Sequence, residues 1–259
     1  MEIGLLQKSY KFKIFLRVFF SIIVVAFMSY NLLSNKNILK VKSLGKPSYT
    51  MKILDGLFCT GLAGELYLIS GTEVREGSNS QVFVYNIKKN KIEAKEVIKN
   101  ASCILAFCET DTLVFFATIG QKKSLGCDLY VWNKKTNKIE HCKHLEEEGV
   151  YALAWDENNS LYIATSFPAR LYQFNLSSGN INIICNDFTQ ESYVRSMAYR
   201  DEYCYLGIGT KADFIKVNVE TGKYQSLLSD NYKTEAFIYA QANATRDTGG
   251  GVYSFVTFQ

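Results

Sequence analysis

A segment that recurs four times along the chain constrains the fold more than any other feature of the sequence. Each copy has an apolar strand that ends in Asn, a short turn, and a second, more polar strand. The spacings between the aligned asparagines are 47, 42 and 43 residues, the size of one supersecondary repeat. The copies read VFVYNIKKNKIEA, LYVWNKKTNKIEH, LYQFNLSSGNINI and FIKVNVETGKYQS, with Asn86, Asn133, Asn175 and Asn218 aligned.

The turn of each copy repeats together with the strands. The residue four positions after the aligned Asn is always Asn or Gly, at Asn90, Asn137, Gly179 and Gly222. These two residue types tolerate a left-handed backbone better than others do. The spacing therefore predicts a left-handed residue at this position in every copy.

Two more strand-like runs precede each hairpin, so one unit contains four strands. The clearest unit reads VYALAWD, SLYIATS, ARLYQFN and NINIICN. Ala154 and Ala198 correspond at a spacing of 44 residues, and Ala106 fits one unit earlier. Four short antiparallel strands per period, without a helix pattern, are typical of β-propeller blades. A two-sheet sandwich is the alternative, but it does not require self-similarity at every fourth strand.

The predicted propeller occupies residues 50–259. We expect an all-β fold of about four complete four-stranded blades plus a partial fifth, which follows an N-terminal apolar helix and is incomplete at its C-terminal end. An open ring would expose unpaired strand edges, so a longer propeller or a completing partner is expected. Residues 34–49 form a linker in which NILKVKS is a candidate closing strand. The complete blades are expected at 50–98, 101–145, 149–188 and 193–229, and AFIYAQAN and GVYSFVTF begin the fifth.

The recurring hairpin L-Y-x-(F/W)-N-x-x-(S/T)-G-x resembles the repeats of the quinoprotein-like and YVTN-type β-propeller superfamily. The resemblance covers residues from about 50 to 259 and implies a propeller fold. That superfamily includes dehydrogenases, lactonases, lyases and binding modules, so the resemblance implies no single activity. The tryptophan pattern of true quinoprotein repeats and the W-D ending of WD repeats are absent, and no cofactor is implied.

An apolar N-terminal segment predicts that the propeller lies outside the cytoplasm. Residues 14–33 form a mostly apolar run in which Arg17 is the one charged residue, and a basic tail, residues 1–13, precedes them. This order keeps the tail in the cytoplasm and sends the rest of the chain across the membrane. The segment is a signal anchor or a signal peptide, and no A-x-A cleavage motif follows Ala26, which favours an anchor. We expect a single-pass membrane protein or, after cleavage, a secreted one, from a low-GC bacterium by its Lys, Asn and Ile content.

The charge and the cysteines argue against several functional classes. A formal net charge of +4, with lysines scattered over predicted turns, lacks the basic stripe of a nucleic-acid-binding protein. The seven cysteines contain no C-x-x-C pair, which argues against a zinc site or a thioredoxin motif. Cys103, Cys185 and Cys204 lie in apolar strand patterns, where free cysteine packs as a small hydrophobic residue. In an oxidising compartment one or two disulfides could form, but no pairing is indicated.

Motifs of catalysis are not evident either. His141 and His144 are the only histidines, and residues three apart on a strand point to opposite faces, so they should not share a metal ion. The sequence has no G-x-S-x-G motif, and the G-T-K run at Gly209 to Lys211 lacks the spacing of a P-loop. We therefore assign no catalytic residue, metal site or cofactor.

Propellers usually bind ligands at one end of the blades. There, loops join the second strand to the third and the fourth strand to the next blade. In this chain those loops carry Arg75, Arg170 and Lys211, while Tyr193 and Arg195 stand at the start of an innermost strand. These five residues are the candidate ligand-binding residues.

Arg195 is the most informative of the five. Its counterparts by register, Cys103 and Tyr151, are less polar. A buried guanidinium needs a partner, and an anionic ligand, a structural ion pair or solvent in the channel would each provide one.

Two functions remain open for such a chain. The first is a non-catalytic extracytoplasmic binding or scaffold module whose loop end engages a polysaccharide or a protein. The second is an enzyme, a polysaccharide lyase or a lactonase-like hydrolase, that uses Tyr193 and Arg195. The scarcity of His and of clustered carboxylates favours the first, because acid–base catalysis usually recruits such groups. A tyrosine base beside a basic residue would suit a lyase, which keeps the second open.

Overall fold

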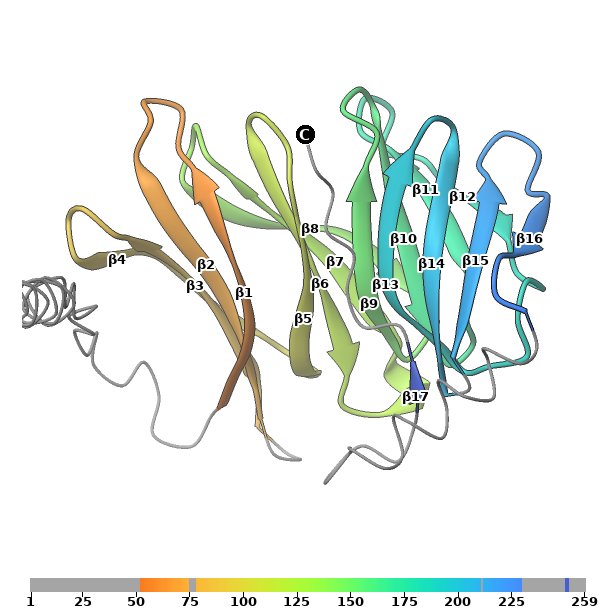
Figure 1. Ribbon diagram of the computed structural model, residues 1–259. Helices are drawn as coiled ribbons and strands as arrows, with labels where there is room; N and C mark the ends of the chain where they lie inside the picture. Colours follow the sequence, from red (N-terminus) through yellow and green to blue (C-terminus); the bar gives the residue numbers. More distant parts are fainter. Residues whose placement is uncertain (1–51, 75–77, 211, 230–249, 252–259) are drawn as a thin grey trace, which may run out of the picture. The chain divides into compact units, whose positions relative to one another are not determined.

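The computed structural model describes residues 52–74, 78–210, 212–229 and 250–251, all within one compact unit, Pro47–Gln259. The described chain is almost entirely β-structure (Figure 1). The elements are β1 (Lys52–Thr60), β2 (Leu66–Glu73), β3 (Ser80–Asn86), β4 (Lys91–Ile98), β5 (Ala101–Glu109), β6 (Leu113–Gly120), the 3-10 helix η1 (Lys123–Leu125), β7 (Cys127–Asn133), β8 (Lys138–Leu145), β9 (Gly149–Trp155), β10 (Ser160–Ser166), β11 (Leu171–Asn175), β12 (Ile181–Cys185), β13 (Tyr193–Arg200), β14 (Tyr203–Thr210), β15 (Asp213–Asn218), β16 (Tyr224–Ser226) and β17 (Gly250–Gly251).

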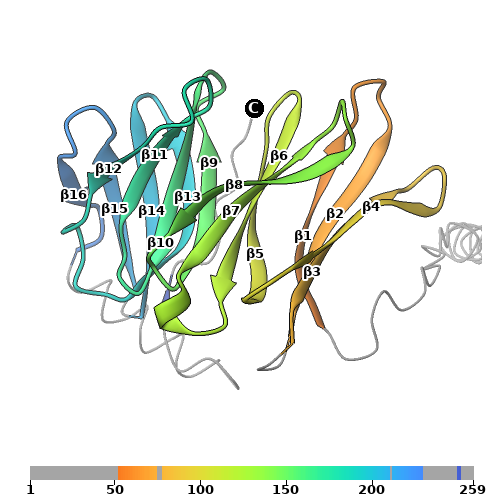
Figure 2. The same cartoon turned by 180° about the vertical axis from the view of Figure 1, so that it is seen from behind.

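Sixteen of these strands form four antiparallel meanders that follow one another along the chain. Blade 1 is β1–β4, blade 2 is β5–β8, blade 3 is β9–β12 and blade 4 is β13–β16 (Figures 1 and 2). Their bounds fall within the four predicted blade ranges. The prediction of an all-β fold with four-stranded propeller blades is confirmed.

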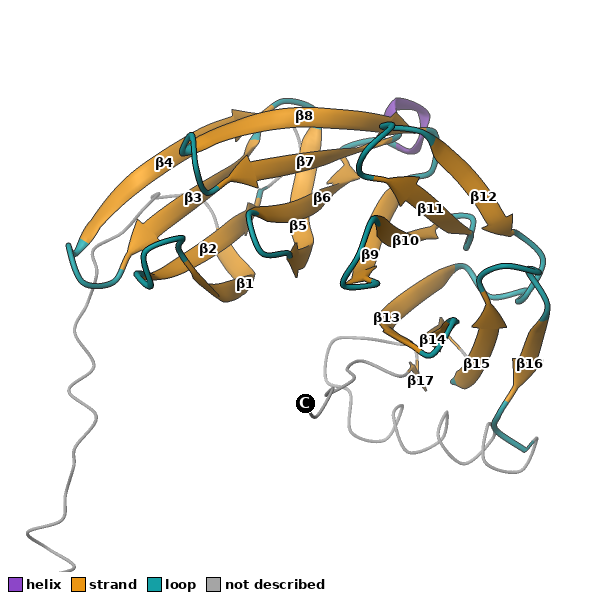
Figure 3. Cartoon of the chain, turned by 90° about the horizontal axis from the view of Figure 1, so that it is seen from above, coloured by secondary structure: helices purple, strands orange, loops and turns teal. Residues whose placement is uncertain are grey.

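The blades are arranged with their first strands on the inside. Seen from above in Figure 3, β1, β5, β9 and β13 lie on the inner side and β4, β8, β12 and β16 on the outer side. Consistent with this, β5 contacts both β1 and β9, β9 contacts β13, and the outer strands β4 and β8 touch each other. Side chains at the start of the first strands are therefore brought together.

The conserved spacing of the hairpins has a simple physical cause. The aligned asparagine accepts a hydrogen bond on Oδ1 from the main-chain N–H three residues later. Lys89 N–H donates to Asn86, and Ser178 N–H donates to Asn175, both at 2.8 Å. Asn side chains often stabilise turns in this way. The next residue is left-handed, as predicted, with φ of 54° at Asn90, 55° at Asn137, 69° at Gly179 and 67° at Gly222.

The hydrophobic core lies between successive blades. Each middle strand is covered on both faces, which explains why SLYIATS, the sequence of β10, is buried at every position. The three predicted core cysteines are buried. Between blades 1 and 2 pack Ile69, Val84, Phe116 and Trp132; between blades 2 and 3, Phe115, Leu129, Ile163 and Phe174; between blades 3 and 4, Tyr162, Leu171, Leu206 and Ile215.

A β-bulge lies near the start of every first strand. In β9 the pairing with β10 passes over Tyr151, and in β13 the pairing with β14 passes over Arg195. An unpaired bulge residue is re-aimed relative to its strand, and such bulges are frequent next to functional sites. Tyr151 and Arg195 occupy equivalent bulge positions, as predicted from their register.

The predicted register of blade 2 was wrong by two residues. The pairing of β5 with β6 passes over both Ser102 and Leu105, so the counterpart of Arg195 is Leu105, not Cys103. For the same reason Cys108, not Ala106, corresponds to Ala154 and Ala198. The shift arises because Cys103 pairs where Gly149 and Tyr193, the first residues of β9 and β13, pair, so that β5 begins two residues earlier, with Ala101 and the unpaired Ser102. A count of sequence positions does not show where a strand begins.

Several predictions concern residues outside the described ranges: the tail 1–13, the apolar segment 14–33, the linker 34–49 and the run AFIYAQAN. No helix within the described ranges is long and apolar enough to cross a membrane. The short strand β17 pairs with Gly209 and Thr210 of β14. Gly209 is equivalent to Ile119 of β6 and Ser166 of β10, the residues at which β9 and β13 pair with the second strand of the preceding blade.

Candidate functional site

The loop face is the end of the blades where second strands connect to third strands and fourth strands to the next blade. Of the five predicted binding residues, Arg170, Tyr193 and Arg195 lie there, at the starts of β11 and β13. Arg75 and Lys211 lie outside the described residues. The three described residues fall into two groups, both built on blades 3 and 4.

The first group, called the aromatic cluster, consists of Tyr151, Phe167, Tyr193 and Arg195. The guanidinium carbon of Arg195 lies 4.3 Å from the ring centroid of Tyr193 and 4.8 Å from that of Tyr151. The two tyrosine rings stack with centroids 5.9 Å apart, and Phe167 contacts Tyr193 at 5.6 Å. These are cation–π distances, so the rings hold the cation in place. Tyr193 and Arg195, predicted together as ligand-binding residues, are in contact with each other.

The backbone builds this cluster from three separate places. The bulges of β9 and β13 supply Tyr151 and Arg195. Opposite Tyr193 stands Gly209, where an added Cβ would lie 2.3 Å from the tyrosine ring. Phe167 has φ of 57°, an uncommon conformation for a bulky residue, and its N–H bonds to Ser192 O at 2.6 Å. Residues held in such conformations cluster at ligand sites.

The tyrosines of the cluster are poor candidates for a general base. Burial raises the pKa of Tyr151, and the nearby Arg195 guanidinium offsets this only in part. Tyr193 is 9% exposed, beneath Arg195 and against Gly209. A base must reach its substrate within hydrogen-bond distance and lose its proton near neutral pH. Tyr151 instead keeps its proton, and the cluster presents aromatic and cationic surface.

The second group, called the Glu147 triad, consists of Glu147, Arg170 and Tyr172. Arg170 Nη1 donates to Glu147 Oε1 at 2.6 Å, and the Tyr172 hydroxyl donates to the same oxygen at 2.5 Å. The side chain of Glu147 is 1% exposed and that of Arg170 is 33% exposed. Burial, followed by the hydrogen bond to Glu147, raises the pKa of Tyr172 to about 12, so its proton stays in place to bond the carboxylate.

Sequence reasoning identified neither Glu147 nor Tyr172 as a site residue. Glu147 is one of three consecutive glutamates, and only the fold buries one of them while its neighbours stay at least partly exposed. Tyr172 reads as an ordinary core aromatic of β11. Tyr151 had one signal, because it shares the register of Arg195.

The two histidines lie differently from the prediction. His141 Nε2 and His144 Nδ1 both lie beside Oδ1 of Asp128, at 3.0 and 2.9 Å. They share a face because the pairing of β8 with β7 passes over Cys142. With this bulge residue left out, His141 and His144 are two paired positions apart, and such residues point to the same side of a strand. The expectation of opposite faces was therefore wrong. In the part of the chain that is described, no group of three or more His, Cys, Asp or Glu could hold a metal ion.

All seven cysteines are free thiols, and none is activated. Burial raises the pKa of Cys59, Cys103 and Cys108 to about 12 and that of Cys142 to about 11. The thiolate is the nucleophilic form, so these side chains are unreactive near neutral pH.

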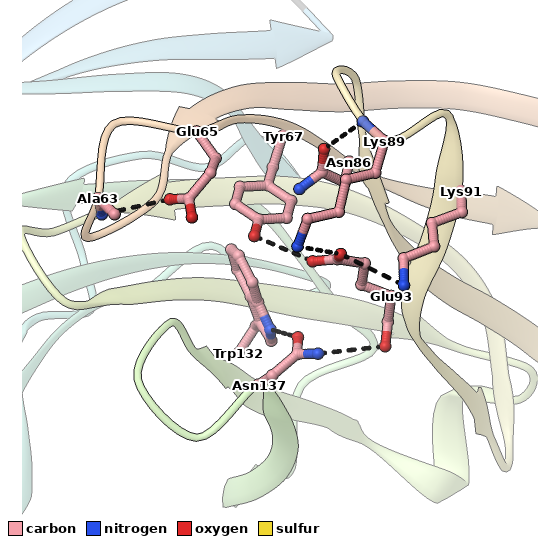
Figure 4. Close-up of polar contacts among 9 residues, drawn as sticks. All are labelled: Ala63, Glu65, Tyr67, Asn86, Lys89, Lys91, Glu93, Trp132 and Asn137. Carbon is pink, nitrogen blue, oxygen red and sulfur yellow. Dashed lines mark hydrogen bonds and ion pairs between the residues drawn. The ribbon is translucent and has the colours of Figure 1, made fainter.

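A separate polar network joins blades 1 and 2 at the end of the blades opposite the loop face, near the β3–β4 and β7–β8 turns (Figure 4). The Tyr67 hydroxyl donates to Glu93 Oε2 at 3.0 Å, and Lys89 Nζ pairs with Glu93 Oε1 at 2.9 Å. Across the blade boundary, Asn137 Nδ2 donates to the main-chain oxygen of Glu93, and Trp132 Nε1 donates to Asn137. The Tyr67 and Trp132 rings meet edge to face at 5.2 Å. This network acts as a clamp between blades.

Comparison with known proteins supports the fold and nothing finer. No model of a known protein family matches the chain, and no curated protein matches it by sequence. Among solved structures, the WD40 repeats of RRP9 align with a TM-score of 0.50 and 11% identity, over 68% of this chain and 53% of that one. The structure of U3-55K aligns with a TM-score of 0.50 and 12% identity, over 70% and 56%.

A nidogen/laminin complex also aligns, with a TM-score of 0.45 and 10% identity, over 60% of each chain. This chain thus spans only 53 to 60% of the length of these structures. WD40 repeats form β-propellers, so the likeness to RRP9 supports the propeller fold of this chain and shows the fold alone.

Proposed function

We propose that the propeller is a non-catalytic binding module whose loop face engages an extended polysaccharide. The aromatic cluster carries this proposal, since two bulged strands and a loop bring three aromatic rings and a guanidinium to one place. Ligand sites are commonly lined by aromatic side chains with a few fixed polar groups. Tyr151 and Arg195 are each only partly buried, so both retain surface that a ligand can contact.

The setting of this module is part of the proposal. The N-terminal apolar segment 14–33 would hold the propeller outside the cytoplasm, as a membrane anchor or as a cleaved signal. A polymer of the cell wall or the surroundings is then within reach. An adhesive or scaffolding role suits a chain in which the described thiols are unreactive and Tyr151 retains its proton.

The test is binding of the full-length chain, kept in detergent, to a panel of immobilised glycans, followed by titration of the best ligand. We expect Tyr151→Ala to weaken that binding about tenfold, because a lost aromatic contact is worth about 1.4 kcal/mol. Phe58→Ala is the matched control. Phe58 is an aromatic of β1 that is 63% exposed and lies outside the cluster, so its removal should leave affinity unchanged.

Absence of binding to every glycan, with the protein folded by circular dichroism, would overturn the polysaccharide proposal. Binding of a protein ligand instead would assign the module to the class of protein-binding propellers. An absorbance assay for unsaturated uronate products separates binding from lyase chemistry. If unsaturated products form with the wild type and do not form with Tyr193→Phe, the propeller is an enzyme and the proposal of a non-catalytic module is wrong.

A further inference from the structure

Glu147 is a buried carboxylate with an incomplete set of hydrogen bonds. Its Oε1 accepts from both Arg170 and Tyr172, whereas Oε2 is buried with no hydrogen-bond partner in the described part of the chain. A buried acceptor without a donor destabilises the folded state, and each such case in a folded protein calls for an explanation.

Stability alone does not explain the triad. Removing a carboxylate from water costs more than the usual attraction to one guanidinium returns, and well-packed apolar residues often stabilise such a site equally well. Glu147 lies close to Cys127 in the packed region between blades 2 and 3, where apolar side chains dominate. Stabilisation of the fold is therefore a weak explanation for this arrangement.

The triad fixes the position of the Arg170 side chain. Glu147 accepts a hydrogen bond from Nη1, and Thr165 Oγ1 accepts one from the main-chain N–H of Arg170 at 3.1 Å. Within the described part of the chain, the side-chain hydrogen bonds of Arg170 all use Nη1, which leaves Nε and Nη2 for a ligand on a side chain that is 33% exposed. An arginine fixed in advance loses little side-chain entropy when it binds a planar oxyanion.

We infer that Arg170 is a carboxylate receptor on the loop face, with Glu147 and Tyr172 as its positioning residues, so that the polymer bound there is an acidic polysaccharide. This inference rests on the proposed polysaccharide binding and adds the charge of the ligand. Exposed Lys122 and Lys123, on the corresponding connection of blade 2, add positive charge at the same end. Glu146, which is also exposed there, opposes it.

The experiment compares one polymer in two charge states. The full-length chain is titrated with a polyuronate and with the same polyuronate after methyl esterification, which removes the charge and keeps the sugar backbone. We expect the wild type to bind the acidic form at least about tenfold more tightly, the range of one charge-assisted hydrogen bond. Arg170→Gln should reduce this ratio to within about twofold, and Glu146→Gln should increase it.

Glu147→Gln tests positioning, because Arg170 remains and only its anchor is weakened. We expect the acid-to-ester affinity ratio to fall several-fold. A purely structural Glu147 would lower the melting temperature and leave that ratio unchanged, since the ratio does not depend on the folded fraction. If single variants fail to fold, the triple variant Glu147→Leu/Arg170→Leu/Tyr172→Phe leaves no buried charge unpaired and should fold. Its ratio should match that of Arg170→Gln.

The outcomes are distinct. If the protein binds neither form, nor any other glycan, the proposed function fails. If it binds both forms equally, or if Arg170→Gln keeps the preference for the acid, the inference about Arg170 fails while polysaccharide binding stands.

Discussion

Arg195 illustrates how a single residue departs from its repeat. Its counterparts Tyr151 and Leu105 stand at the same bulge in blades 3 and 2, and only blade 4 places a cation there. The stacking of that cation on Tyr151 and Tyr193 makes the position part of an arrangement built by blades 3 and 4. Arg195 thus contributes to the difference between blade 4 and the other two blades at the loop face.

Gly209 is the residue on which the aromatic cluster most directly depends. In Gly209→Ala the new methyl group would meet the Tyr193 ring at 2.3 Å, so this ring, which also contacts Arg195, must shift. We expect destabilisation of about 1–3 kcal/mol, as for other overpacked sites, together with weaker glycan binding. Urea unfolding and the glycan titration check the two effects. Unchanged affinity in a folded Gly209→Ala protein would show that the cluster does not contact the ligand.

At the scale of the element, the hairpin is the unit that sequence describes best. Two features of the turn are local requirements, set by five consecutive residues. The asparagine accepts a hydrogen bond from a turn N–H, and the residue four positions later is left-handed. A neighbouring blade restricts the residue type at the turn only where its atoms lie close to that turn. The two glycine turns differ in this respect.

Gly179 and Gly222 have nearly the same backbone conformation but different surroundings. A Cβ at Gly179 meets nothing within 4 Å, whereas at Gly222 it would lie 2.6 Å from Ile184 O of the preceding blade. Asn occupies the same turn position in blades 1 and 2 with φ of 54° and 55°, so Gly179→Asn should be tolerated within about 0.5 kcal/mol. Gly222→Asn should cost about 1–3 kcal/mol. Equal unfolding free energies for the two variants would contradict this explanation.

At the scale of the whole molecule, blades are joined by apolar packing and by polar clamps such as the one around Glu93. The hydrogen bond and ion pair with Lys89 hold the pKa of Glu93 below its ordinary value of 4.5. A carboxyl group with a lowered pKa stabilises the folded state above its unfolded pKa. That contribution is lost as pH falls below about 4.5 and through the folded value.

We therefore expect Glu93→Gln to make unfolding less sensitive to acid. The wild type should lose more stability than the variant between neutral pH and about pH 3, measured by urea unfolding at each pH. Lys52 pairs with Glu73 at 3.5 Å on the surface, with side chains 74% and 40% exposed, and Glu73→Gln is the matched control. The same acid dependence in Glu93→Gln and wild type would show that the clamp does not depend on the charge of Glu93.

The sequence by itself determined the repeat, the four blades and the chemistry of their turns. These depend on contacts between residues close in the chain, and their patterns recur often enough to be counted. It also identified Arg170, Tyr193 and Arg195 as residues of the loop face, because blade topology places those connections at one end.

Only the tertiary structure decided the rest. Residue spacing shows neither the earlier start of β5, which shifted the register of Cys103, nor the bulge in β8 that brought His141 and His144 to one face. A bulge of one unpaired residue reverses the direction of every side chain after it. The burial of Glu147 beneath Arg170 depends on how blade 3 packs against blade 2, a contact between segments 23 residues apart. Side chains that meet across blades are chosen by packing, and packing is a property of the folded chain.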